Sequence, residues 1–153
     1  MLHAVHATSV QREHAQRCGA DGAGSERDLC EEVRRQITVP ARNLAGETTL
    51  GEFIDLAAAC RLFLTNDSGA MHVASAVGIP TVAVFGATDD TATGPTGPLA
   101  RVVREHAECS PCLLRDCPID HRCMTRVTAA RVAGVAQELW EESASLWTLA
   151  PRS

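Results

Sequence analysis

The chain has 153 residues, 45% hydrophobic and 22% charged, which suits one globular domain with an aliphatic core. Its formal net charge of −5 argues against a nucleic-acid partner, because phosphate backbones are bound by basic surfaces. The longest apolar runs are too short to cross a bilayer, and residues 1–20 contain no stretch resembling a signal peptide. We therefore expect a cytoplasmic protein without a transmembrane segment.

The pattern of regular structure begins only after the N-terminal segment 1–23, which holds scattered polar residues and no apolar run for a strand. Ser25 to Asp28 has the spacing of a capping box before the amphipathic run Leu29 to Ile37, which predicts a helix. Asn43 to Gly46 is predicted as a short strand that runs into a turn. A second capping box at Thr49 to Glu52 predicts another helix, ending near residue 59.

The next segments alternate between buried strands and a helix of small residues. Arg61 to Thr65 and Thr81 to Phe85 are short apolar runs without alternation, as expected for strands covered on both faces. Between them, Ala70 to Val77 is predicted as a helix that Gly78 caps. A loop at 86–98 follows the second strand.

The last third of the chain adds one strand, a loop and one helix. Arg101 to Arg104 is predicted as a short strand, 107–124 as a Cys-rich loop, and Thr128 as the cap of a helix reaching about Glu142. We expect one domain at 24–142 and a frayed tail at 143–153. Strands alternating with helices at this spacing predict an α/β fold, a parallel sheet with helices on both faces and a ligand site along one edge.

The segment most informative about chemistry lies where the first buried strand turns into the helix of small residues. Backbone N–H groups at a helix start lack internal partners, and Gly69 carries no side chain to keep a phosphate away from them. His72 lies one turn further on, where an imidazole can donate to a phosphate oxygen. Spacing alone supports an alternative equally well, in which Asp67 or Ser68 caps the helix and His72 is a packing residue.

Four of the seven cysteines lie in one loop, as Cys109, Cys112, Cys117 and Cys123. Together they provide enough thiolates for a tetrahedral, structural zinc site, although only the first pair has the usual ligand spacing. Free thiols, or a disulfide formed on oxidation, are the alternatives.

Residues 65–76 closely resemble the signature of glycosyltransferase family 9, the heptosyltransferases. The similarity covers roughly residues 24–140, and its further motifs are Asn43-Leu44-Ala45-Gly46, Thr49-Leu50, Gly78 to Asp89, Thr93-Gly94-Pro95, Cys109-Ser110-Pro111-Cys112, Arg115-Asp116-Cys117-Pro118 and Cys123-Met124. The Cys-rich run is most similar to the heptosyltransferase II branch. The resemblance implies the C-terminal, Rossmann-like half of a GT-B fold, which binds ADP-heptose, while the N-terminal half binds the lipopolysaccharide core acceptor.

The resemblance also implies roles for single residues at the β–α turn. The backbone at Ser68 and Gly69 would bind the diphosphate, Asp67 would face the heptose hydroxyls, and His72 would support the phosphate region. Thr88, in the next loop, is a weaker candidate for sugar contact, because the loop could equally be a plain turn.

Two further positions correspond to the nucleoside side of the family's site. Thr48 matches a position that lines the adenine pocket, while Asp28 and, less surely, Glu26 fall where a carboxylate meets the ribose. For Asp28 the capping role is the competing interpretation.

The resemblance also indicates what the sequence lacks. The catalytic carboxylate of the family lies in the N-terminal domain, so no catalytic residue is assigned here, and the first strand of the C-terminal domain has no counterpart in 1–23. We expect a gene fragment that requires no cofactor and is inactive alone, from an enzyme that is cytoplasmic or peripheral at the inner face of the bacterial inner membrane. Alternatives are a non-catalytic Cys-rich zinc-binding or interaction module, and a GT-B enzyme that uses another nucleotide sugar.

Overall fold

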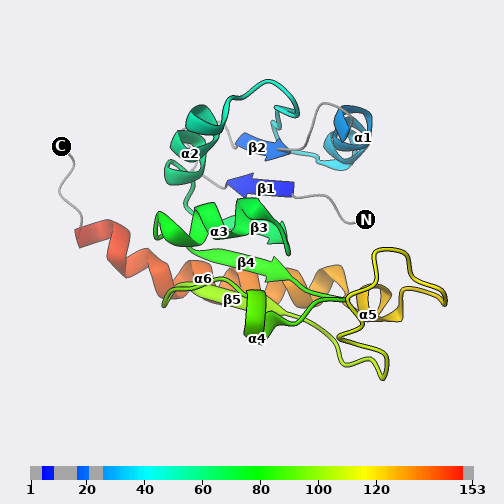
Figure 1. The fold of residues 1–153 in the computed structure, drawn as a ribbon. Helices are drawn as coiled ribbons and strands as arrows, with labels where there is room; N and C mark the ends of the chain where they lie inside the picture. Colours follow the sequence, from blue (N-terminus) through cyan, green and yellow to red (C-terminus); the bar gives the residue numbers. More distant parts are fainter. Residues whose placement is uncertain (1–4, 9–16, 21–25, 150–153) are drawn as a thin grey trace.

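A three-stranded parallel sheet forms the centre of the computed structural model, which describes residues 5–8, 17–20 and 26–149 (Figure 1). Its strands are β3 (Phe63–Asn66), β4 (Thr81–Val84) and β5 (Ala100–Val103), in the order β3-β4-β5. Thr81 is the register partner of both Phe63 and Ala100. All three strands therefore end at the same edge of the sheet, as the strand–helix alternation predicts.

Helices cover both faces of this sheet, which confirms the predicted α/β architecture. On one face, Met71 of α3 (Gly69–Ala76) packs with Ala83 and Phe85. On the other face, the long helix α6 (Ala129–Leu149) packs Leu139 against Val82 and the end of β5. Because successive side chains of a strand point to opposite faces, Val82 packs against α6 and its neighbour Ala83 packs against α3.

Two more helices precede the sheet in the chain. In α2 (Leu50–Ala58), Phe53 packs edge-on against Phe63 of β3, with ring centroids 6.2 Å apart. The predicted capping box is confirmed, since Glu52 N donates to the Thr49 hydroxyl and Glu52 accepts from Thr49 N. The first helix, α1 (Arg27–Gln36), buries Cys30 against Ala45. Two helices of four residues, α4 (Asp90–Thr93) and α5 (Arg122–Thr125), lie in the loops after β4 and β5.

The prediction that residues 1–23 contain no strand is wrong for two short stretches. β1 (Val5–Thr8) pairs antiparallel with β2 (Arg17–Ala20), and β1 lies beside β3 (Figure 1). Strand pairing uses backbone N–H and C=O groups that almost every residue has, so a search for apolar runs misses it. The β3 side of the sheet is therefore covered by β1.

Three local expectations also need correction. α1 has Glu26 as its N-cap and no side-chain cap, while Ser25 lies outside the described residues. Asn43–Gly46 does not form a strand and leads into a turn at 45–47, where the Asn43 side chain accepts a hydrogen bond from Ala45 N at 3.1 Å. The tail expected to fray from residue 143 continues α6 as far as Leu149, and Ser143 is buried. Within the described ranges, no helix is long and apolar enough to span a membrane.

Candidate functional site

Polar segments follow all three strands at their common edge. β3 is followed directly by Asp67 and Ser68, β4 by the loop to Asp89, and β5 by Arg104 and the Cys-rich loop. In sheets of this type, ligands bind outside the carboxyl ends of the strands. The edge therefore brings together the turn and the loop that the sequence singled out.

The turn between β3 and α3 is held by the sheet. Asp67 N donates to Val84 O at 3.2 Å, which extends the pairing of β3 with β4 by one residue. Ser68 is the N-cap of α3 in extended conformation, but its side chain caps no backbone amide of the helix. Its hydroxyl instead lies 3.2 Å from the hydroxyl of Thr65. The structure therefore does not show the alternative in which the Ser68 side chain caps the helix.

The start of α3 is open on its outer side. Gly69 and His72 are exposed, Asp67 and Ser68 are half-buried, and a Cβ added to Gly69 would meet no heavy atom within 4 Å. The first backbone amides of a helix lack intrahelical acceptors and carry partial positive charge. The structure therefore gathers these four predicted residues around a helix start that an anion can reach.

Thr48 lines a hollow beside α2. This hollow has a volume of about 460 Å³, and the residues around it are Arg42, Leu44, Glu47, Thr48, Glu52, Asp55 and Leu56. The bonds from the Thr49 backbone and hydroxyl hold the pKa of Glu52 below its usual range. Its lining combines two leucine side chains with five polar or charged residues, so the hollow offers both apolar contact and hydrogen-bonding groups.

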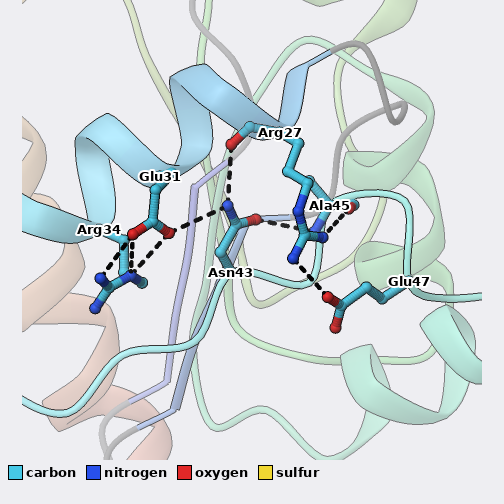
Figure 2. Close-up of polar contacts among 6 residues, drawn as sticks. All are labelled: Arg27, Glu31, Arg34, Asn43, Ala45 and Glu47. Carbon is cyan, nitrogen blue, oxygen red and sulfur yellow. Dashed lines mark hydrogen bonds and ion pairs between the residues drawn. The ribbon is translucent and has the colours of Figure 1, made fainter.

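The segment leading to Thr48 is tied to α1 by a network of polar contacts (Figure 2). The Asn43 side chain donates to Arg27 O at 3.0 Å. Arg27 in turn donates to Ala45 O at 2.9 Å and pairs with Glu47 at 2.7 Å. Glu31 lies on the other side of Asn43, and its bonds to Arg34 lower its pKa to about 2.

The two candidate ribose carboxylates lie at the start of the same helix. Asp28 is exposed in the first turn of α1, and Glu26 is its half-buried N-cap residue. The Glu26 side chain makes no cap hydrogen bond. The capping role that competed for Asp28 involves Ser25, which lies outside the described residues, so it stays a prediction. Both residues lie on a different element from the β3–α3 turn.

Thr88 lies half-buried in the loop after β4. Its neighbour Asp89 caps α4 by accepting from Thr91 N at 3.0 Å and from the Thr91 hydroxyl at 2.7 Å. These bonds, with help from the charge of Arg104, hold the pKa of Asp89 below its usual value. Sequence reasoning missed Arg104 and Ser110, which hold this loop from 14 and 24 residues away in the chain.

The four cysteines of the Cys-rich loop are free thiols in the structure. Burial raises the pKa of the Cys123 thiol, and the nearness of Cys109, Cys112 and Cys117 raises it further. In the part of the chain that the structure describes, no group of three or more His, Cys, Asp or Glu side chains could hold a metal ion. The zinc site therefore stays a prediction from the sequence.

Comparisons with known proteins agree with the motif at the β3–α3 turn. The family model described as glycosyltransferase family 9 (heptosyltransferase) matches residues 16–122. Lipooligosaccharide heptosyltransferase 2 of Campylobacter jejuni serotype O:2 is 35% identical over 128 residues, which cover 80% of this chain and 40% of that protein. Lipopolysaccharide heptosyltransferase 2 of Escherichia coli K12 is 51% identical over 63 residues, covering 41% of this chain and 18% of that protein.

Two solved structures have a similar fold. The structure of E. coli ADP-heptose lps heptosyltransferase II matches with a TM-score of 0.68 and 31% identity, over 82% of this chain and 36% of that one. A glycosyl transferase family 9 protein from Veillonella parvula matches with a TM-score of 0.70 at 24% identity, over the same shares, which supports the fold alone. The chain thus spans two fifths or less of the length of the relatives named here.

Proposed function

The chain belongs to glycosyltransferase family 9, the heptosyltransferases, and on that premise we propose that it forms the donor-binding part of a lipopolysaccharide heptosyltransferase. The donor in this proposal is ADP-heptose. The acceptor is the lipopolysaccharide inner core, which would be bound by the part of a family enzyme that this chain does not match. The observation that carries the proposal is the open start of α3 at the carboxyl edge of the sheet.

The diphosphate of the donor fits the β3–α3 turn. Its negative charge would meet the partial positive charge of the helix start, and Gly69 leaves room for close approach to the backbone. His72, exposed one turn into α3, can donate to a phosphate oxygen. Asp67 would repel a phosphate, so we place its carboxylate at the heptose hydroxyls, which donate hydrogen bonds to it.

The nucleoside of the donor fits the side of the site formed by α1, α2 and the turn between them. The hollow at Thr48 offers Leu44 and Leu56 as apolar contacts for adenine. Asp28, exposed at the start of α1, is the candidate acceptor for the ribose hydroxyls, with Glu26 as the second. The network of Figure 2 supports this placement, because it fixes the Thr48 segment to the helix that carries Asp28.

The proposed reaction is an inverting transfer in which an acceptor hydroxyl attacks the anomeric carbon and ADP leaves. The residues of this chain would stabilise the charge that develops on the departing diphosphate, through the amides of the α3 start and His72. The general base that deprotonates the acceptor is not among them. The reaction needs no cofactor, and we expect this chain by itself to bind the donor without transferring the sugar.

Calorimetry with ADP and ADP-heptose tests this function directly. We expect the parent chain to bind both, and the double variant Asp67→Ala/His72→Ala to bind ADP-heptose roughly 30-fold more weakly, at ~1 kcal/mol for each of the two lost hydrogen-bonding side chains. The matched control is His106→Ala/Asp116→Ala, which removes an exposed histidine and an exposed aspartate elsewhere and should keep the parent's affinity. Absence of ADP binding by the parent would refute the proposal.

Two further measurements separate the competing functions. Competition among ADP, UDP and GDP reports the nucleotide, and preference for UDP or GDP would indicate a different nucleotide-sugar enzyme. Zinc analysis of the purified protein tests the interaction-module alternative. One zinc per chain without any nucleotide binding would favour that alternative over donor binding.

A further inference from the structure

Three hydrogen bonds join the Cys-rich loop to the loop after β4, and Arg104, at the end of β5, adds an ion pair to the same loop. The Ser110 hydroxyl donates to Gly86 O at 2.5 Å and accepts from Arg104 at 3.1 Å. Arg104 also forms an ion pair with Asp90 at the start of α4. Ala87 O accepts from two consecutive backbone amides of the Cys-rich loop, at 3.0 and 2.9 Å. Gly86 O and Ala87 O, the two carbonyls before Thr88, thus both accept hydrogen bonds from the Cys-rich loop.

The backbone and packing around these bonds leave little freedom. Leu113 has left-handed backbone with a φ of 58°, and its N–H and that of Cys112 are the two donors to Ala87 O. A non-glycine residue keeps such a conformation only where its surroundings impose it. On the other side, a Cβ added to Gly86 would collide with Met124 Sδ and lie 3.4 Å from Cys123 Sγ. The Cys-rich loop therefore packs directly on Gly86.

We propose that the Cys-rich loop is a positioning element for the sugar side of the donor site, with Arg104 and Ser110 as its positioning residues. Ser110 fixes the Gly86 carbonyl, and Arg104 holds both Ser110 and Asp90. Together with the backbone amides that fix the Ala87 carbonyl, they set the direction in which the chain presents Thr88 at the common edge of the sheet. Thr88 would then contact the sugar of the donor and not its nucleotide. This inference rests on the proposed function, and it gives the Cys-rich loop a task that needs no metal.

The predicted signature is a loss of discrimination between ADP-heptose and ADP. Ser110→Ala and Arg104→Gln should each leave the ADP affinity within about twofold of the parent and weaken ADP-heptose about fivefold, the value of one net hydrogen bond. Two matched controls remove the same kinds of contact elsewhere. Ser75→Ala removes a hydroxyl bonded to Thr96 O, and Arg101→Gln removes a guanidinium paired with Glu142. Both controls should keep the parent's ratio of affinities.

Hydrogen exchange supplies a readout that does not need a ligand. In the Ser110→Ala chain, the amides of residues 86–90 should exchange faster, while those of 66–72 keep the parent's rates. Equal weakening of both ligands, or faster exchange throughout the domain, would show a general structural role and overturn the proposal, as would an unchanged affinity ratio. A parent that binds neither ligand would instead refute donor binding itself, and with it the sugar-side role.

Discussion

At the scale of single residues, the candidate site depends on two places where no side chain covers the first amides of α3. Ser68 leaves the first amides of α3 without a side-chain cap, and Gly69 leaves the space in front of them empty. Folding does not require this glycine, since its backbone is outside the left-handed region and a Cβ there meets nothing. The role that we propose for Gly69 is therefore in binding the diphosphate and not in folding.

Gly69→Ala should therefore separate stability from binding. We expect the free energy of unfolding to rise by about 0.4–1 kcal/mol, because alanine reduces the entropy of the unfolded chain. The ADP affinity should fall roughly tenfold, or ~1.4 kcal/mol, because the methyl group occupies the space in front of the amides. Urea unfolding and calorimetry measure the two effects. Gly134→Ala in α6, where the added Cβ also meets nothing, is the control and should stabilise without changing ADP binding. Unchanged ADP affinity in Gly69→Ala would place the diphosphate elsewhere.

The residues of this site differ in how far the sequence could predict them. Asp67 to His72 are consecutive or one turn apart, so local spacing alone brought them together. Arg104 and Ser110 could not be found that way, because their partners Asp90 and Gly86 lie in another loop. Only the parallel register of β4 and β5 places these two loops at one edge.

At the scale of elements, side chains with a local hydrogen-bonding partner were predicted best. The capping box at the start of α2 was correct because Thr49 and Glu52 bond within one turn. The strand predicted at Asn43 was wrong because the Asn43 side chain accepts a hydrogen bond from Ala45 N and donates one to Arg27 O of α1, which favours a turn there. This turn and α1 are therefore one unit, and that unit has a pH-dependent contact.

Glu31 should make the stability of that unit depend on acid. Its pKa is lowered from 4.5 to about 2 by its bonds to Arg34, so its contribution is complete above pH 4.5 and is lost as the pH falls toward 2. We expect Glu31→Gln to be less stable than the parent at pH 7, and the difference to shrink below pH 4.5. Urea unfolding at pH 7, 4 and 3 measures this. Glu32→Gln, exposed on the same helix, should show a much smaller difference at each pH. A Glu31→Gln difference that stays constant with pH would contradict the assignment.

At the scale of the whole molecule, the sequence predicted the layers but not the N-terminal strand pair. The layers follow from apolar runs such as Thr81 to Phe85, whose burial on both faces requires helices on both sides. β1 and β2 have no such run, and their pairing depends on backbone bonds between segments that sequence periodicity does not relate. The strand–helix layers alone were enough to predict the common edge of the sheet and the location of the candidate site.

Since α6 covers the face of the sheet opposite α3, it should stabilise the fold without taking part in binding. Leu139 is 1% exposed and packs on Val82 and Val103, so Leu139→Ala should lower the free energy of unfolding by ~2–5 kcal/mol. Leu114→Ala, at a side chain 52% exposed, is the control and should change the free energy of unfolding by less than ~0.5 kcal/mol.

Because ADP binds only the folded chain, excess ADP should restore part of the stability lost in Leu139→Ala, by ~2.7 kcal/mol at 100 times Kd. Urea unfolding with and without ADP measures both effects. If ADP stabilised the parent but not Leu139→Ala at the same saturation, α6 would be coupled to the site, contrary to this separation of the two faces.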